Sequence, residues 1–453
     1  MHGMGIPVAT KLCRIAQKAR QEPNLRFVNL FHPLKVEWLR ECFEGLRSNA
    51  APGMDAVTQE AYARPVEENL AALENRLHPM SYRPRAVRRV YIPKPGTDKK
   101  RPLGIPVLED KLVQAAMARV LEQIYEQDFI KDSYGFRPGR RCHDALRALS
   151  ETVERGDIEW IVEADIKGFF DHVNHDHLMA FLSRRIGDER MLRMGKRFLM
   201  AGVNEDGAFS ASEEGTPQGG VISPLRANIY PHYVLDQWVE QAFRPTCRGR
   251  ARLIRYADDF VVCFSYQGEA EAFQRDLVAR LAQFGLEVEP TKTKGIAFGP
   301  QAAFYGKGRK PETFDFLGFT HYGSRSRNGK RFRMKRRTSK KRLRAKLAAF
   351  RQWLQRNRTK YKTRELWQKA GQKMQGHYRY YGISDNYPSL KAFAHAAERL
   401  LHSWLNRRGG KRLMSWAKFK KMDACFPLPR PRIYVRLFDK RPKKSQQLLF
   451  SFT

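Results

Sequence analysis

The stretch "RYADDFVV", residues 255–262, sets two carboxylates, Asp258 and Asp259, between two apolar runs. Apolar, β-branched and aromatic side chains dominate residues 253–256 and 260–264, which predicts two buried strands joined by a tight turn. Asp pairs are common at hairpin turns, where local backbone hydrogen bonds and solvent satisfy them. At the tip of a buried hairpin, however, adjacent carboxylates repel each other unless a cation neutralises them, and oxygen ligands favour Mg²⁺. The stretch therefore predicts either a solvated turn or a divalent-cation site.

A third carboxylate stands at the end of another apolar strand. The segment "EWIVEADIKGFFDHV", residues 159–173, predicts a strand that ends at Asp165, a turn at Gly168, and then a helix capped by Asn174 or Asp176. Three carboxylates that hold two metal ions about 3.5–4 Å apart suit in-line phosphoryl transfer. Three nearby histidines fit no metal-ligand spacing, so we expect them at a solvated helix start: His172, His175 and His177.

Composition indicates a nearly neutral body with a strongly basic C-terminal third. The chain has 453 residues, 42% of them hydrophobic, which is enough for two or three domains. The net charge is +37, and residues 321–453 hold 38 Lys and Arg against 5 Asp and Glu, whereas residues 1–320 hold 46 against 42. A polyanionic partner is therefore expected. No apolar run is long enough for a membrane span, no signal-peptide pattern is present, and six cysteines without a C-x-x-C pair favour reduced thiols in the cytoplasm.

Two loops carry residue types that bind phosphates or form plain turns. The glycines and prolines of "EEGTPQGGVISPLRANIY", residues 213–230, predict a loop whose backbone can approach a ligand closely, followed by a helix that starts at Ser223. The segment "VYIPKPGTDKKRPLGIP", residues 90–106, predicts a basic hairpin. Such a hairpin can hold a triphosphate, although a solvated turn has the same composition.

The C-terminal third predicts basic helices. Residues 338–357 repeat apolar side chains at helical spacing with basic residues largely off that stripe, and acidic residues are nearly absent. The segment "HYRYY", residues 377–381, suits either stacking on unpaired RNA bases or core packing. A further helix over residues 389–405, with Ser389 as its cap, has an apolar stripe, and residues 441–453 are expected to be disordered. The stripe comprises Leu390, Phe393, Ala397, Leu401 and Trp404.

Seven blocks of the sequence, in this order, resemble the reverse-transcriptase blocks of group II intron-encoded proteins. They are "KPGTDKKRPLGIPVLEDKLVQ", "SYGFRPGRRCHDAL", "EADIKGFFDHV", "GTPQGGVISPL", "RYADDFVV", "FGLEVEPTKTK" and "FDFLGFTH". The later segments "MQGHYRYYGISDNYPSL" and "WLNRRGGKRLMSWAKF" are similar to the maturase region of the same proteins. The resemblance extends from about residue 10 to about residue 440.

The resemblance implies an α+β fold of the right-hand polymerase type, with fingers, a palm built on an antiparallel sheet, and an α-helical thumb and maturase region. The implied domains are an N-terminal extension with the start of the fingers (1–85), fingers and palm (86–325), thumb (326–370), a maturase-like RNA- and DNA-binding region (371–440) and a tail (441–453).

The resemblance also assigns the acidic residues. Asp165 and Asp258 would chelate two Mg²⁺ ions, for which Mn²⁺ can substitute, with Asp259 beside them and the backbone carbonyl of Ile166 as a further ligand. The metals would then neutralise the carboxylates, which resolves the electrostatic problem of the paired aspartates.

Other residues match the nucleotide site of that family. Phe170 stands at the position of the sugar gate, where a ring under the deoxyribose would clash with a 2′-hydroxyl, although a core phenylalanine would look the same. Gln218 and Gly219 match the loop around the incoming nucleotide and template base. Lys94 and Arg101 match cations of the fingers that bind the triphosphate.

Two further assignments concern basic residues. Lys292 matches a lysine that assists the pyrophosphate leaving group, but Lys294 is equally well placed in the sequence. The residues expected to bind nucleic acid are Arg336, Arg337, Lys340, Lys341, Arg344, Arg351 and Arg379.

We therefore expect an RNA-directed DNA polymerase that uses an RNA template, a DNA primer and dNTPs, and that binds group II intron RNA to promote splicing and retrohoming. The alternatives are a free-standing enzyme of the same fold used in DNA repair or phage defence, and an idle polymerase that acts only as an RNA-binding splicing factor. The three aspartates disfavour the last. A cytoplasmic, nucleoid-associated location in a bacterium is expected, without a membrane partner.

Some features depart from the family. A single cysteine, Cys425, lies in the C-terminal region, so we expect no metal-binding endonuclease domain. Arg226 and Pro231 stand where leucine is usual. A proline inside a helix costs about 3 kcal/mol unless the helix bends or ends there, and a buried arginine needs a partner or solvent.

Overall fold

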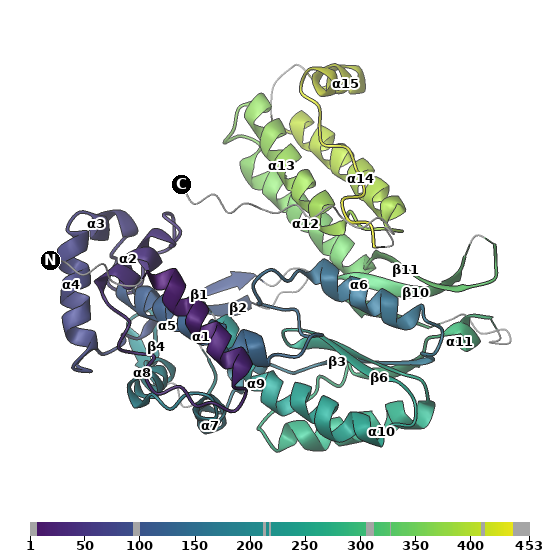
Figure 1. Cartoon of the computed structure of the whole chain (residues 1–453). Coiled ribbons are helices and arrows are strands. Elements are labelled where there is room, and N and C mark those ends of the chain that lie inside the picture. The colour runs from purple at the N-terminus through teal and green to yellow at the C-terminus, as the bar shows by residue number, and fades with distance from the viewer. Residues whose placement is uncertain are drawn as a thin grey trace. The chain divides into compact units, whose positions relative to one another are not determined.

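The computed structural model describes residues 7–93, 100–211, 214–216, 219–304, 312–326, 328–408 and 413–437. The chain divides into two compact units, of which the first ends at Gly299 and the second begins at Pro300. Both units mix helices and strands (Figure 1). Lys94, Gln218 and the predicted disordered tail lie outside the described residues.

The first unit contains ten α-helices and eight strands among its described residues. Its helices are α1 (Val8–Gln21), α2 (Val36–Glu44), α3 (Gln59–Ala63), α4 (Val66–Leu77), α5 (Leu108–Asp128), α6 (Cys142–Val153), α7 (His175–Ser183), α8 (Glu189–Leu199), α9 (Ser223–Pro231) and α10 (Gln267–Ala282). Its strands are β1 (Val87–Pro93), β2 (Lys100–Ile105), β3 (Trp160–Asp165), β4 (Val203–Glu205), β5 (Ala208–Ser210), β6 (Ala251–Tyr256), β7 (Asp259–Phe264) and β8 (Lys294–Ala297).

These strands form two four-stranded sheets. One has the order β2-β1-β4-β5, and its β1–β2 hairpin confirms the predicted basic hairpin. The other has the order β6-β7-β3-β8 and is antiparallel throughout. The predicted strands on either side of the aspartate pair, and the strand that ends at Asp165, are the three adjacent strands β6, β7 and β3 of this second sheet.

Apolar side chains hold the second sheet in the core. Strand β7 is buried from Phe260 to Phe264, and helix α10 packs against β3, β7 and β8 through an apolar face that includes Phe273 and Leu277. Each fully buried side chain of this size contributes roughly 1.5–3 kcal/mol. The sheet therefore forms a rigid platform for the residues at the ends of its strands.

Helix α9 begins at Ser223, as predicted, and ends at Pro231. The next residues, His232–Asp236, form a π-helical turn. A π-turn widens the helix where the proline supplies no N–H donor, so the chain continues in the same direction instead of breaking. The helix therefore accommodates Pro231 by ending in a π-helical turn.

Arg226 of α9 is buried without a carboxylate partner among the described residues. The side chain is 4% exposed, its Nη2 donates to the carbonyl of Gly195 at 3.0 Å, and its Nε has no partner in the described part of the chain. Burial lowers the pKa of Arg226 to about 10. A single carbonyl does not compensate for the lost hydration of a cation.

Arg226→Met is therefore expected to stabilise the chain. Methionine keeps the unbranched stem but removes a buried charge that has no ionic partner, and the free energy of unfolding is expected to rise by about 1–3 kcal/mol. Urea unfolding measures the difference, with Arg193→Met, which alters an exposed position on α8, as the matched control. A lower unfolding midpoint for Arg226→Met than for the control would show that the charge stabilises the fold.

The second unit combines a small sheet with a helical bundle. Its strands β9 (Thr313–Phe316), β10 (Phe319–Arg325) and β11 (Phe332–Thr338) form an antiparallel sheet in the order β11-β10-β9. Its helices are α11 (Pro300–Phe304), α12 (Lys340–Asn357), α13 (Thr363–Tyr381), α14 (Tyr387–Asn406) and α15 (Trp416–Cys425). The proposed boundary between residues 325 and 326 falls in the hairpin between β10 and β11.

The apolar stripes predicted for α12 and α14 face the bundle core. Phe350 and Leu354 of α12 belong to the same buried cluster as the five residues of the α14 stripe. In "HYRYY", His377 and Tyr378 are buried whereas Arg379 and Tyr380 are exposed, so the segment combines core packing with an exposed edge.

The prediction that Ser389 caps α14 is wrong. The helix begins two residues earlier, at Tyr387, and Asn386 precedes it. Pro388 fits the first turn because a helix needs no N–H donor there. The Asn386 amide does not cap the helix, since its side chain accepts from the Thr338 N–H at 2.7 Å and donates to the Tyr381 carbonyl at 2.8 Å.

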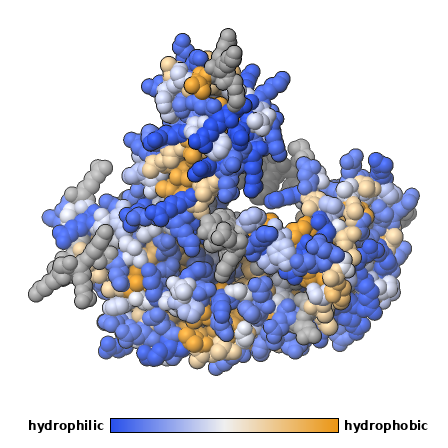
Figure 2. Space-filling view, turned by 180° about the vertical axis from the view of Figure 1, so that it is seen from behind, coloured by the Kyte–Doolittle hydropathy of each residue, from blue (hydrophilic) through white to orange (hydrophobic). Residues whose placement is uncertain are grey.

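Hydrophilic side chains cover most of the bundle on the side seen in Figure 2. Within the described ranges, no helix combines the length and apolar character needed to cross a membrane. All six cysteines are free thiols.

Candidate active site

The aspartate pair lies at the tip of the β6–β7 hairpin. Tyr256 and Asp259 pair across the strands, which leaves Ala257 and Asp258 as a two-residue turn. Ala257 has φ of +58°, a conformation that costs a non-glycine residue about 1 kcal/mol or more. The turn must therefore be held by contacts from outside the hairpin.

Arg255 supplies the main contact. Its side chain is fully buried, and its Nη1 donates to the Ala257 carbonyl at 3.0 Å. Its Nε and Nη2 donate to the two carboxylate oxygens of Asp236 in the π-helical turn, at 2.7 and 2.5 Å. Burial alone would raise the pKa of Asp236, but Arg255 and His232 hold it below its usual value. This bidentate pair ties the turn to the helix that follows α9.

The "SYGF" block lies against the same turn. Arg255 Nη1 also donates to Asn228, whose side-chain amide donates to the Gly135 carbonyl at 2.6 Å. A Cβ on Gly135 would lie 2.3 Å from the Ala257 nitrogen, so only glycine allows this approach.

The sequence does not predict Arg255, Asp236 and Asn228 as site residues. The available signal was the alternation in β6, where Arg255 takes an inward position in line with Ala251 and Leu253. A charged residue at such a position indicates a buried partner, but the sequence does not reveal which one.

The β3–β7 register brings the third carboxylate to the same place. Asp165 pairs directly with Asp259, and Asp258 precedes Asp259 in the turn. Burial raises the pKa of Asp258, and the negative charge of Asp165 raises it further, whereas Arg101 and Lys292 oppose the shift. The residues predicted as metal ligands therefore lie close enough to influence one another's charge.

Lys292 stands beside these carboxylates. Its Nζ forms an ion pair with Asp165, and although burial would lower the pKa of Lys292, this contact raises it. Lys294, the alternative in the sequence, lies 3.8 Å from Glu163 instead. The structure thus separates the two lysines and puts Lys292 at the site.

The donor set suits a hard divalent cation. Carboxylate oxygens and a backbone carbonyl are the ligands that Mg²⁺ prefers, and burial, with the charge of Asp165 in addition, raises the pKa of Asp258. Among the described side chains, no group of three or more His, Cys, Asp or Glu residues is arranged to hold a metal ion. The ammonium group of Lys292 is the cationic partner of Asp165. A metal ion that binds Asp165 therefore has to compete with this ammonium group.

The glycine-rich loop joins the nucleotide-site candidates. The Thr216 N–H donates to the carbonyl of Phe170 at 2.8 Å. Phe170 is half-buried and packs edge-on against Phe169. A Cβ on Gly219 would lie 2.5 Å from the carbonyl of Gly104 in β2, the strand that carries Arg101. The loop therefore bridges the turn after β3 and the basic hairpin.

Of the three histidines that were expected at a solvated helix start, His172 is exposed as predicted, whereas the prediction is wrong for His175 and His177. His175 is buried, and its Nε2 donates to the Gly215 carbonyl at 2.7 Å. His177 packs against Phe181 and Phe284. Asn174 is the cap of α7, since its side chain accepts from the His177 N–H at 3.0 Å.

The nucleic-acid-binding candidates of the second unit divide by exposure. The prediction that Arg336 binds nucleic acid is wrong, because its side chain is fully buried. Side chains along β11 alternate between inward and outward positions, and Arg336 takes an inward one. The exposed candidates are Arg337, Lys340, Lys341, Arg344, Arg351 and Arg379.

An antiparallel sheet with three aspartates at the ends of adjacent strands resembles the palm of nucleotide-polymerising enzymes. Residues 92–321 match the family "Reverse transcriptase (RNA-dependent DNA polymerase)". The chain belongs to this family, which implies a right-hand polymerase fold and a divalent-metal-dependent class of enzymes.

Intron proteins are among the relatives to which the chain is similar. The group II intron-encoded protein LtrA of Lactococcus lactis subsp. cremoris is 37% identical over 236 residues, which cover 52% of this chain and 39% of the relative. Protein YkfC of Escherichia coli (strain K12) is 33% identical over 352 residues, covering 70% of this chain and 88% of the relative. A 91 kDa protein in the cob intron of Schizosaccharomyces pombe is 44% identical over 153 residues, covering 34% and 18%. The chain thus spans about two fifths of the length of LtrA.

Arg255→Lys tests the support of the turn. Lysine keeps the charge but cannot bind Asp236 in bidentate fashion and reach Ala257 as well. We expect kcat of RNA-templated DNA synthesis to fall roughly 10- to 100-fold, because displacement of about 1 Å costs that much, with little change in KM.

Arg252→Lys is the matched control. Arg252 lies on the same strand and binds Asp132 in bidentate fashion at 2.7 and 2.8 Å, but it does not contact the turn. Steady-state kinetics of both variants show whether the loss of kcat is specific to Arg255. Equal loss in the two variants would contradict a specific role for Arg255.

Proposed function

We propose that the chain synthesises DNA on an RNA template from a DNA primer and dNTPs, and that it binds structured group II intron RNA to promote splicing and retrohoming. The observation that carries the polymerase proposal is the β3–β7 register, which pairs Asp165 with Asp259 beside the Asp258 turn. The intron-encoded relatives support the intron role and favour it over a free-standing enzyme of repair or defence.

In this proposal Asp165, Asp258, Asp259 and the Ile166 carbonyl hold two Mg²⁺ ions, for which Mn²⁺ can substitute. Such ions, when bound, activate the primer hydroxyl and stabilise charge on the leaving oxygen. The chain's own contribution is to fix the carboxylates before substrate arrives. Arg255 holds the turn, and the β3–β7 register holds Asp165 opposite Asp259.

Cations around the carboxylates bind the triphosphate. Arg101 of β2 and Lys94, which lies outside the described residues, would hold phosphate oxygens, and Arg101 already influences the charge of Asp258. Lys292 would move from Asp165 to the pyrophosphate, where its ammonium donates a proton or neutralises the leaving group. Its position 55% exposed beside Asp165 leaves it free to make that change.

In this proposal the sugar and base of the nucleotide contact Phe170 and the glycine-rich loop. Phe170 would pack under the deoxyribose and exclude a 2′-hydroxyl, while Gln218 and Gly219 frame the incoming base. The contact of Thr216 with the Phe170 carbonyl supports a common site, since it ties the loop to the gate.

The subdomains follow from this assignment. We propose fingers and palm over residues 86–325, a thumb over 326–370 and a maturase-like region over 371–440. The exposed cations of the last two regions would bind nucleic-acid phosphates, and the near absence of acidic residues there supports this role. A cytoplasmic, nucleoid-associated location in a bacterium belongs to the same proposal.

Asp258→Asn is expected to lower primer extension on an RNA template by roughly 10³-fold or more. The substitution preserves volume but removes a charge that the reaction needs, and several kcal/mol of metal-dependent stabilisation go with it. Glu163→Gln, which neutralises a carboxylate of β3 near Lys294, is the control and should stay within about threefold of wild type. Full activity of Asp258→Asn would refute the assignment.

Phe170→Ala should relax sugar selection. Loss of the ring opens space for a 2′-hydroxyl, so the ratio of kcat/KM for dNTP over NTP is expected to fall about 10- to 200-fold. Phe170→Tyr keeps the ring and should preserve the ratio. If alanine changes incorporation of both nucleotides equally, the ring serves packing and not selection.

A further inference from the structure

The end of the glycine-rich loop is bonded to helix α5 through one buried side chain. Gln114 of α5 is 5% exposed, and its Oε1 accepts a long hydrogen bond from the Ile222 N–H at 3.5 Å. Ile222 is the N-cap of α9, and its apolar side chain cannot bond the first N–H groups of that helix. The Gln114 amide therefore supplies an acceptor at the point where the loop ends and the helix begins.

The contact between Gln114 and Gly220 is closer still. A Cβ on Gly220 would lie 2.8 Å from Gln114 Oε1 and 2.9 Å from Ser223 Oγ, so either neighbour would have to shift to admit it. The cavity between α5 and this part of the loop measures only about 10 Å³, which holds roughly one water molecule. The loop backbone thus packs directly on the amide, with little room to take another position.

The residue before Gly220 lies on strand β2. Gly219 has φ of +116°, and a Cβ there would lie 2.5 Å from the carbonyl oxygen of Gly104. Gly104 and Arg101 both belong to β2, and α5 follows that strand directly in the sequence. One continuous segment, residues 101–114, therefore carries Arg101 and contacts the loop at two places.

A second buried group fixes α5 to the neighbouring sheet. The carboxylate of Asp110, one turn before Gln114, accepts from the Tyr82 hydroxyl at 2.7 Å and from the Arg85 N–H at 3.1 Å. These bonds tie α5 to the segment that leads into β1. Helix α5 is thus anchored to the sheet that contains β1 and β2, and Gln114 extends this anchor to the glycine-rich loop.

We propose that Gln114 is a positioning residue for nucleotide selection. It holds the loop on the segment that carries Arg101, so that the backbone that frames the base and the cation that binds the triphosphate keep a fixed spacing. This inference rests on the proposed function, which gives those roles to Gly219 and Arg101. Because the amide acts through the loop and not on the reacting atoms, its loss should impair nucleotide binding and discrimination more than the chemical step.

Gln114→Met tests this role, since methionine keeps the length of the side chain and removes the acceptor. In primer extension on an RNA template, KM for dNTPs should rise about three- to tenfold, the effect of one lost hydrogen bond. The turnover number kcat should stay within about twofold of wild type, because the carboxylates are untouched. The ratio of kcat/KM for a paired over a mispaired dNTP should fall about three- to tenfold.

Gln123→Met is the matched control. Gln123 lies on the same helix, but its amide donates to the Arg119 carbonyl of that helix at 3.2 Å, so its loss should change neither KM nor the ratio. Circular dichroism and thermal unfolding check that each variant folds. Equal effects of the two substitutions, or a fall in kcat without a change in KM, would overturn the positioning role.

A double-mutant cycle tests the contact itself. Gly220→Ala alone should lower kcat/KM, because the added methyl group meets the Gln114 amide. In the Gln114→Ala background the oxygen that the methyl group meets is gone, so the further loss from Gly220→Ala should be at least about threefold smaller. Losses that simply multiply would show that the two residues act independently and would overturn the inference.

Hydrogen–deuterium exchange separates failure of this inference from failure of the proposed function, because it needs no enzymatic activity. Gln114→Met should speed exchange in peptides that span residues 219–230 and leave residues 255–262 as in wild type, whereas Gln123→Met should alter neither. Unchanged exchange over residues 219–230 would overturn the role of Gln114 even in an active polymerase. A wild-type chain that extends no primer, with faster exchange in the variant, would refute the polymerase and keep the contact of Gln114 with the loop.

Discussion

The buried ion pair between Arg255 and Asp236 is the constraint on which the arrangement of the carboxylates depends. Both side chains are fully buried, and removal of one partner from such a pair costs about 3–5 kcal/mol. The same guanidinium holds the carbonyl of Ala257, whose backbone is in a conformation that alanine disfavours. Strand β7 starts from this turn, and β3 takes its register from β7. One arginine thus fixes, through successive backbone pairings, the place where Asp258, Asp259 and Asp165 meet.

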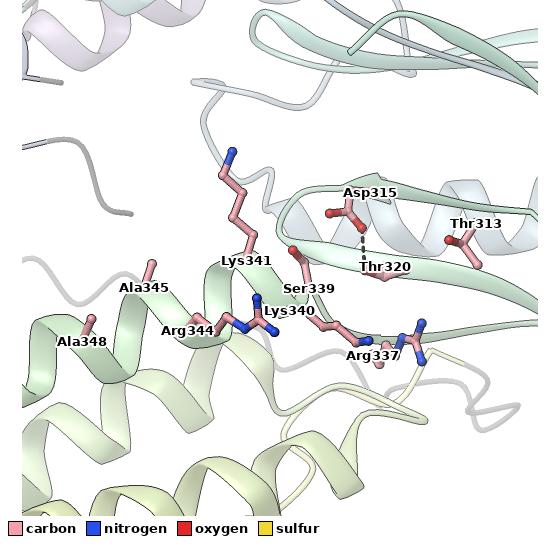
Figure 3. Close-up of a pocket in the computed structure, with 10 residues that line it drawn as sticks. All are labelled: Thr313, Asp315, Thr320, Arg337, Ser339, Lys340, Lys341, Arg344, Ala345 and Ala348. Carbon is pink, nitrogen blue, oxygen red and sulfur yellow. Dashed lines mark hydrogen bonds between the residues drawn. The ribbon is translucent and has the colours of Figure 1, made fainter. Parts of the chain in front are cut away.

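The two units present opposite electrostatic problems. In the first, carboxylates are gathered and partly buried, so that the pKa of Asp258 rises and cations are needed. In the second, exposed cations gather at the first turns of α12 (Figure 3), where no acidic residue offsets them in the first turn of the helix. A polymerase requires both: divalent ions where the bond forms, and phosphates of template and primer where the strands are held. The separation also agrees with the sequence, in which the basic surplus is concentrated after residue 320.

Local patterns predicted most of the elements that form the site. The apolar runs on either side of Asp258 gave the hairpin, and the strand before Asp165 ended where expected. The predictions failed at residues whose position depends on contacts with distant parts of the chain. Arg336 is basic like its neighbours, but the alternation of β11 turns it inward. Ser389 looks like a cap, but Asn386 and Pro388 set the start of α14 earlier. Arg255, Asp236 and Asn228 meet only in the fold, and no local pattern reveals such a network.

The most direct measurement is a crystal structure of the full chain with an RNA template, a DNA primer, an unreactive dNTP analogue and Mn²⁺, in which anomalous scattering locates the ions. Two peaks about 3.5–4 Å apart, bound by the carboxylates of Asp165 and Asp258, with Lys292 released from Asp165 and turned to the triphosphate, are predicted. An analogue bound elsewhere, or ions that leave Asp165 paired with Lys292, would contradict the assignment of these carboxylates to catalysis.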